Sequence, residues 1–231
     1  MSETTNELHP SEVAYNLAKA RKVTAEAQSA EYLAEGHFYG VEEARRNDLQ
    51  LTISNDHLRV LRFSAAVTPG AVDTAIARLT KWHREDNLGD VRLPIEIIFT
   101  SPGGSIIDGL RLYDFIQEIR HAGHHVTTGT YGMAASMAGV LLQAGDVRYA
   151  SGNAWLMIHR ASFGAQGSMD TMEDEVALVT RMEGRLLDIL DHRSNITRKT
   201  IMTNWKRKDW WLTPEEALKA GFIDEIRGVL R

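Results

Sequence analysis

The stretch IEIIFTSPGGS, residues 95–105, joins a buried strand to a sharp turn, and this junction decides the fold class. Residues 95–99 are mostly β-branched or aromatic, which is typical of a strand covered on both faces of a sheet. The segment SPGGS then ends the strand, since proline and glycine mark turns. After it, apolar side chains recur at helical spacing, at Ile106, Leu110, Tyr113 and Ile116. The stretch therefore predicts one βα unit.

The alternation of strand and helix continues on both sides of this unit. Thr68-Pro69 is a typical helix start, and an apolar helix is predicted at 136–142. Further strands are predicted at 58–63, 126–130, 147–150 and 155–158. Strands that alternate with helices predict an α/β fold with a largely parallel sheet.

A long amphipathic helix is predicted at about 169–192. Its apolar stripe consists of Met169, Met172, Val176, Val179, Met182, Leu186 and Leu190. Acidic residues in its first turns suit the positive end of the helix dipole. Further on, TPEE at 213–216 has the form of a capping box, and Gly221 closes the short helix that it opens.

Residues 1–50 differ from the rest in composition. They are rich in Ala, Glu, Lys and Arg and poor in large aliphatic residues, which predicts one or two exposed helices. We therefore expect an N-terminal helical arm at 1–50 and one α/β domain at 51–231. A mobile arm and a contact with a partner or another subunit both fit this composition.

Charge and composition exclude several classes of function. The 231 residues carry a formal net charge of −5, so no basic face for nucleic acid is expected. The absence of cysteine rules out disulfides, thiolate metal sites and cysteine nucleophiles. No signal peptide is apparent, and the longest apolar stretch, 133–142, is about half of a membrane span. We expect a cytoplasmic protein.

The segment GMAASMAG, residues 132–139, places Ser136 between a predicted strand and a predicted helix. A serine hydroxyl becomes a nucleophile only when it is exposed and a base accepts its proton. A tight strand-to-helix turn with small neighbours provides that exposure. Ala134 and Ala138 stand where a nucleophile-elbow motif has glycine, so this pattern alone favours a buried helix that Ser136 merely caps.

Two other features could complete a catalytic site. The double glycine of SPGG can turn backbone N–H groups toward a developing oxyanion, although an ordinary turn explains it equally well. His159 follows the strand WLMI, and the ordinary histidine pKa of about 6.5 suits a general base. His121, His124 and His125 lack carboxylates at ligand spacing, so we expect a solvated turn there and no metal site.

Taken in order, SPGG, GMAASMAG, WLMIH and the tail DWWLTPEEALKAGFIDEI resemble the Clp protease proteolytic-subunit family over residues 58–226. The resemblance implies a crotonase-like (ClpP-like) spiral of βα units. In such proteins the long helix, here about 169–192, is the handle that joins two stacked heptameric rings. The implied activity is that of a serine endopeptidase acting on unfolded proteins and peptides inside the ring chamber, without a metal or bound cofactor.

The resemblance also assigns site residues. Ser136 matches the nucleophile and His159 the base, while Gly104 and Met137 match the residues whose backbone N–H groups form the oxyanion hole. The family's third residue, an aspartate, is ambiguous here. Alignment forward from the long helix puts Asn204 at its position.

Alignment backward from DWWL puts Trp205 at the position of the family's aspartate instead, and Asp209 is the second choice for this role after Asn204. We expect Asn204, because an amide oxygen can accept the imidazole N–H and an indole cannot. A neutral amide stabilises imidazolium less than a carboxylate does, so this choice predicts a slow enzyme. A purely structural role fits Asn204 equally well, namely that it caps or ends a helix.

Several other functions remain open at this point. A structural ring subunit that lost efficient catalysis with its aspartate is the first, and a crotonase-type acyl-CoA enzyme is the second. A serine–lysine peptidase is weaker, because His159 and no lysine occupies the matched base position. The expected partners are peptide substrate and other copies of the chain, with an AAA+ unfoldase in doubt because about 50 residues precede the recognisable fold.

Overall fold

The computed structural model describes residues 56–87, 91–162, 168–206 and 209–228. The predicted arm at 1–50 lies outside the described residues, so the arm and the domain boundary after it stay predictions. Among the described helices, none has both the length and the apolar character that a membrane span requires.

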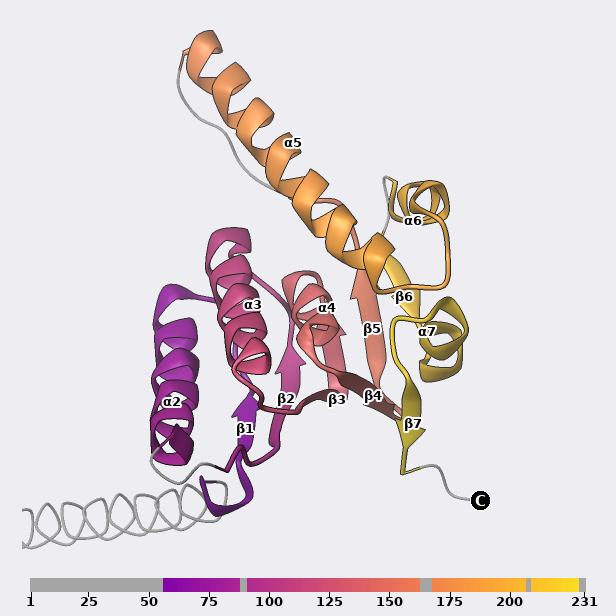
Figure 1. The fold of residues 1–231 in the computed structure, drawn as a ribbon. Coiled ribbons are helices and arrows are strands. Elements are labelled where there is room, and N and C mark those ends of the chain that lie inside the picture. The colour runs from indigo at the N-terminus through magenta and orange to yellow at the C-terminus, as the bar shows by residue number, and fades with distance from the viewer. Residues whose placement is uncertain (1–55, 88–90, 163–167, 207–208, 229–231) are drawn as a thin grey trace, which may run out of the picture. The chain divides into compact units, whose positions relative to one another are not determined.

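Strands and helices alternate along most of the described chain (Figure 1). The strands are β1 Val60–Phe63, β2 Ile95–Ser101, β3 Val126–Ala135, β4 Val147–Ser151, β5 Trp155–Ile158, β6 Trp210–Leu212 and β7 Glu225–Arg227. The helices are α2 Pro69–Asn87, α3 Ile106–His121, α4 Met137–Leu141, α5 Met169–His192, α6 Arg198–Trp205 and α7 Pro214–Ala220, with a 3-10 turn at Leu142–Ala144. The α/β class predicted from the sequence is confirmed.

The sheet is parallel in the order β1-β2-β3-β4-β7, with a branch at β3. The first half of β3 pairs with β4, from Thr127 to Thr130. Its second half, Met133 to Ala135, pairs in parallel with β5 instead. Strand β6 then adds to β5 and is antiparallel. The branch carries the end of β3 to β5, where the candidate site forms.

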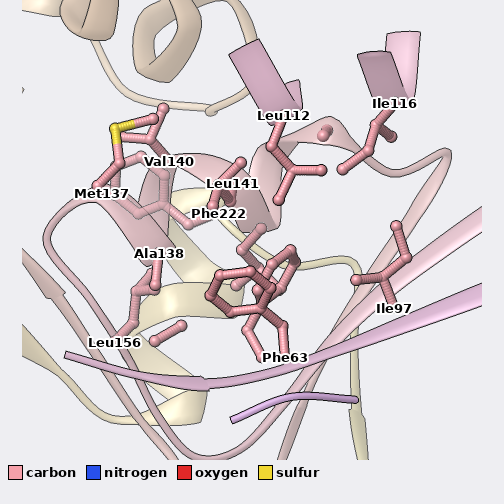
Figure 2. Close-up of a cluster of buried hydrophobic side chains, with 14 of the residues drawn as sticks. Phe63, Ile97, Leu112, Ile116, Met137, Ala138, Val140, Leu141, Leu156 and Phe222 are labelled. Atoms are coloured by element: carbon pink, nitrogen blue, oxygen red, sulfur yellow. The ribbon is translucent and has the colours of Figure 1, made fainter. Parts of the chain in front are cut away.

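The core lies between the sheet and the helices α2, α3 and α4. Every residue of α4 is buried, so this short helix is wholly internal. Its Met137 and Leu141 pack among Leu112 of α3, Phe63 of β1 and Phe222 after α7 (Figure 2). The glycine of α3, Gly109, allows this approach, since a Cβ there would lie 2.3 Å from Cγ of Met137. Burial on all sides fixes the position of α4 in the core.

The predicted long helix forms α5, Met169–His192, and extends away from the βα units (Figure 1). Ser168 caps it, because the Ser168 side chain accepts a hydrogen bond from the Thr171 N–H. Its fully buried residues, Leu186, Leu187 and Leu190, all belong to the C-terminal part. The N-terminal part of the apolar stripe is not buried by the described residues of this chain.

The C-terminal segment is fixed by the capping box and by one buried arginine. Thr213 and Glu216 form the predicted box, and Gly221 ends α7 with a left-handed φ of 77°. Arg148 of β4 donates to both carboxylate oxygens of Asp224, at 2.6 and 3.0 Å, and to the Gly221 carbonyl at 2.8 Å. Burial opposes ionisation of Asp224, but hydrogen bonds from Arg148 outweigh it and lower the carboxyl pKa. The Gly-x-x-Asp end therefore docks α7 and β7 onto the sheet.

Candidate active site

Ser136 stands between β3 and α4 in a conformation that is rare for a residue with a side chain. Its φ is 55° and its ψ is −122°, outside the regions that L residues commonly occupy. Such strain costs about 1–3 kcal/mol and persists only where the surroundings enforce it. Here the Ser136 N–H donates to the Met157 carbonyl at 2.8 Å, and the buried α4 follows directly. The result is the sharp turn that exposes a nucleophile, although Ala134 and Ala138 depart from the usual glycine pattern.

His159 reaches Ser136 because their strands are neighbours. Strands β3 and β5 pair in parallel, with Ala135 opposite Met157, so the residues after both strands emerge at the same edge. The His159 Nε2 lies 2.7 Å from the Ser136 Oγ. This is a hydrogen-bond distance, and the imidazole is 23% exposed. The two side chains therefore have the geometry of a nucleophile and its base.

Asp209 occupies the third position of this chain of hydrogen bonds. Its Oδ1 lies 3.2 Å from the His159 Nδ1. The antiparallel register of β5 and β6, with Ile158 opposite Trp210, brings residue 209 opposite residue 159. Because a carboxylate only accepts hydrogen bonds, Nδ1 carries the imidazole proton and Nε2 is left to accept from the serine hydroxyl.

The preference for Asn204 is corrected by this geometry. Asn204 belongs to α6, and its amide donates to the Thr200 carbonyl one turn earlier at 3.0 Å. Within the described residues it makes no hydrogen bond to His159. Trp205, the other aligned residue, is buried at the end of the same helix. The runner-up, Asp209, is the residue beside the histidine, so the reason to expect a weak amide-assisted enzyme is removed.

Gly104 lies where one wall of an oxyanion site would be. The Val67 N–H donates to the Gly103 carbonyl at 2.8 Å, and the Ser105 N–H donates to the Val67 carbonyl at 2.8 Å. Since backbone groups alternate in direction along an extended segment, the Gly104 N–H points away from Val67. A Cβ on Gly104, which has a φ of 149°, would lie 2.4 Å from the Val67 carbonyl oxygen. Only glycine fits in this bridge, and the SPGG segment is its one visible sign in the sequence.

Gly103 brings the same loop against the nucleophile. A Cβ built on it would lie 2.7 Å from Cβ of Ser136 and 2.9 Å from the Met137 backbone nitrogen. The loop and the start of α4 are thus in direct contact. Among the hydrogen bonds formed by the described residues, neither the Gly104 nor the Met137 N–H has an acceptor. Both are available to a developing negative charge beside Ser136.

An ion pair that sequence reasoning missed holds the segment after His159. Arg160 binds the Glu183 carboxylate of α5 through two nitrogens, at 2.8 and 3.0 Å. The same carboxylate accepts the Ala161 N–H at 3.1 Å. The hydrogen bonds that Arg160 donates to Glu183 raise the pKa of its guanidinium. The base is thereby connected to α5, a link that no local pattern could predict across 23 residues.

The histidines between α3 and β3 do not form a simple solvated turn. His124 is buried, with Nδ1 at 3.0 Å from the Leu93 carbonyl and Nε2 at 3.1 Å from Nδ1 of His83. His121 and His125 do lie at the surface. The expectation of a solvated turn is therefore wrong for His124, whose partner 41 residues away could not be inferred from the sequence.

Comparison with known proteins identifies the family to which this fold belongs. The family model described as Clp protease matches residues 56–229. The chain is 37% identical over 143 residues to ATP-dependent Clp protease proteolytic subunit 2 of Tropheryma whipplei, an alignment covering 61% of this chain and 77% of that protein. It is 36% identical over 170 residues, 73% of this chain and 81% of the relative, to the ATP-dependent Clp protease proteolytic subunit of Dehalococcoides mccartyi.

A third relative is the ATP-dependent Clp protease proteolytic subunit of Deinococcus radiodurans, 35% identical over 134 residues, which are 57% of this chain and 64% of that protein. The family match covers nearly all of the described residues, including β3, β5 and β6, which carry the candidate site. The mostly parallel sheet also agrees with the crotonase-like α/β fold that the sequence motifs imply. This chain is a member of the Clp protease family.

Proposed function

We propose that this protein is a serine endopeptidase in which Ser136, His159 and Asp209 form the catalytic triad. The observation that supports it most is the continuous set of contacts from Asp209 Oδ1 to His159 Nδ1 and from His159 Nε2 to Ser136 Oγ, at 3.2 and 2.7 Å. The strained conformation of Ser136 adds to this, since such strain concentrates at functional residues.

The mechanism follows from the roles of these atoms. The Ser136 Oγ attacks the carbonyl carbon of a peptide bond while its proton passes to the His159 Nε2. The Asp209 carboxylate holds the imidazole in the required tautomer and stabilises the imidazolium. The carbonyl oxygen becomes an oxyanion that accepts hydrogen bonds from the Gly104 and Met137 N–H groups.

When the tetrahedral intermediate collapses, the C–N bond breaks and the imidazolium donates its proton to the leaving amine. A water molecule then attacks the acyl-enzyme ester, with His159 again accepting a proton, and releases the second product and free Ser136. Every step uses groups of the chain and water, so the proposal requires no metal or bound cofactor.

We also propose that the peptidase acts as a subunit of a homo-oligomeric ring in the cytoplasm. The relatives are named as subunits of ATP-dependent proteases, and the apolar side chains of α5, Met169, Val176 and Leu178, are 69, 49 and 51% exposed. Exposed apolar side chains gathered on one helix favour contact with another chain. In such a ring the substrates are peptides and unfolded proteins, and a separate ATPase supplies the unfolding.

Labelling with a fluorophosphonate, which reacts with activated serines, tests the triad. Ser136→Ala should abolish labelling, and Asp209→Asn should slow it by about 10²–10⁴-fold, because the imidazole loses its tautomer control. Asn204→Ala is the matched control and should label like wild type. Labelling that survives Ser136→Ala, or that depends on Asn204 and not on Asp209, would contradict the assignment.

A further inference from the structure

The pocket beside Ser136 is small, and most of the residues that line it are apolar. It is lined by Gly104, His159 and Ser136 itself on one side. The remaining wall is built largely from aliphatic side chains and one indole: Ile106, Met137, Val140, Ile158, Leu186, Leu190 and Trp205. Its volume is about 50 Å³. Since one water-sized sphere fills about 10–15 Å³, the pocket has room for only a few non-hydrogen atoms.

A second, much larger pocket is lined mainly by residues of α5 and α6. Its volume is about 990 Å³, and Leu187 and Met202 form part of its floor. Arg198, Lys199 and Lys206 give it a basic rim. Among the described residues that line the two pockets, Trp205 is common to both. The indole therefore stands at the boundary between the small pocket and the large one.

The fold holds Trp205 firmly in that position. It is the last residue of α6, is 4% exposed, and lies one turn after Ile201, which is completely buried. Thr197 begins the helix by accepting a hydrogen bond from the Thr200 N–H. Ile201 and Trp205 belong to the same hydrophobic core as Leu186, Leu187 and Leu190 of α5. A wall packed into the core in this way cannot swing aside without breaking that packing.

The pocket also has a defined place in the reaction. A scissile carbonyl whose oxygen faces the Gly104 and Met137 N–H groups has its carbon beside the Ser136 Oγ. The side chain of the residue that supplies this carbonyl is then the substrate group nearest to the small pocket. The described residues that line this pocket include no aspartate, glutamate, lysine or arginine, so a charged substrate side chain would find no ionic partner there to offset its desolvation.

We propose that Trp205 is a specificity-determining residue, closing the pocket so that the enzyme prefers a small apolar side chain at the residue whose carbonyl is attacked. Alanine fits the available volume, whereas leucine and phenylalanine require the space behind the indole. This inference rests on the proposed peptidase function. Truncation of Trp205 joins the small pocket to the large one and shifts the preference toward large apolar side chains.

The test uses fluorogenic peptides that differ only in that residue, Ala, Val, Leu or Phe, with kcat/KM measured for each. Wild type should prefer Ala. Trp205→Ala should raise the Leu-to-Ala and Phe-to-Ala ratios at least about tenfold, since a few buried methylenes discriminate by about 10–200-fold. Trp205→Phe should give an intermediate ratio. Met202→Ala, on the same helix but lining only the large pocket, should keep the wild-type ratios.

Fluorophosphonate labelling of each variant separates the two proposals, because a small probe carries no side chain for the pocket. Wild type that neither labels nor cleaves any peptide contradicts the peptidase function itself. Wild type that labels but cleaves the Leu and Phe peptides as well as the Ala peptide overturns the role of Trp205. So does a Trp205→Ala variant that labels normally and keeps the wild-type ratios. The wild-type profile and Trp205→Phe decide the question even if Trp205→Ala fails to fold.

Discussion

At the scale of single residues, the candidate site depends on close backbone contacts as much as on reactive side chains. Gly103 and Gly104 let a loop pass between Val67 and Ser136 where no Cβ could fit. The bridge to Val67 fixes both carbonyl and amide directions of this loop. Glycine is therefore required at both positions because a side chain would collide with its neighbours, and not only because a turn needs a flexible backbone.

We predict that Gly104→Ala lowers peptidase activity by about 10²–10³-fold, the usual effect of losing one oxyanion donor. The added Cβ would meet the Val67 carbonyl oxygen at 2.4 Å and must displace the loop that carries the N–H. Fluorogenic peptide hydrolysis and fluorophosphonate labelling measure the effect. Gly70→Ala, where no atom lies within 4 Å of the new Cβ, is the matched control and should be fully active. Equal activity in both variants would remove Gly104 from the oxyanion site.

Local patterns in the sequence point to Ser136 and His159, whereas the third residue beside them, for which Asp209 is the second choice after Asn204, follows from a long-range register. Ser136 and His159 each follow a short apolar strand that can be read from its own sequence. The choice between Asn204 and Asp209 depends on the pairing of Ile158 with Trp210, which joins segments about fifty residues apart. A one-residue insertion obscures that register in the sequence and leaves it unchanged in the sheet.

At the scale of elements, α2 is attached to the turn before β3 by a pair of histidines in hydrogen-bond contact. His83 Nδ1 and His124 Nε2 share one hydrogen bond, so only one of these atoms can carry a proton. The charged groups around His83 are Asp86, Arg92 and Glu118, besides His124. Burial, followed by repulsion from His124 and Arg92, lowers the pKa of His83. Protonation of His83 therefore opposes folding.

We predict that the free energy of unfolding falls as the pH decreases from about 6.5, the ordinary histidine pKa, toward the lower pKa of folded His83. In that window the unfolded chain binds more protons than the folded chain, so stability rises with pH. Urea denaturation at pH 7.5, 6.5 and 5.5 measures the slope. His83→Gln should flatten it, and His121→Gln, at an exposed position nearby, should not. An unchanged slope in His83→Gln would show that the pair does not govern acid stability.

The contact between β4 and the C-terminal segment also has a testable electrostatic basis. Removing the Asp224 charge leaves the buried Arg148 guanidinium with only neutral acceptors. We predict that Asp224→Asn lowers the free energy of unfolding by about 1–3 kcal/mol, less than the roughly 3–5 kcal/mol typical of a wholly buried ion pair, because Arg148 is buried but the Asp224 side chain is 41% exposed to solvent. Chemical denaturation measures the loss, and Asp188→Asn, whose ion pair with Arg198 is exposed, should change it by no more than about 1 kcal/mol. Equal losses in the two variants would show that the burial of Arg148 adds nothing to its ion pair.

At the scale of the whole molecule, the described residues of one chain leave much of the apolar surface of α5 exposed. Its buried leucines lie in the last two turns, and Val176 and Leu178 remain about half exposed. A helix that projects without tertiary packing is marginal in water, because most helical stability in proteins comes from a packed apolar face. The sequence predicted the helix and its stripe, but the stripe alone could not show whether the same chain covers it.

We predict that burial of this stripe against another copy of the chain stabilises both the assembly and the N-terminal part of α5. Val176→Asp places a charge in the contact and should shift the protein to a smaller mass by light scattering. Hydrogen exchange should then speed up at 169–182, while amides around Leu187 and Leu190, which are buried within the chain, keep their protection. Asp174→Asn, on the same exposed stretch but without a new charge, should leave mass and exchange unchanged. If Val176→Asp keeps the wild-type mass and protection, the stripe does not form the contact, and α5 must hold its structure without a second chain.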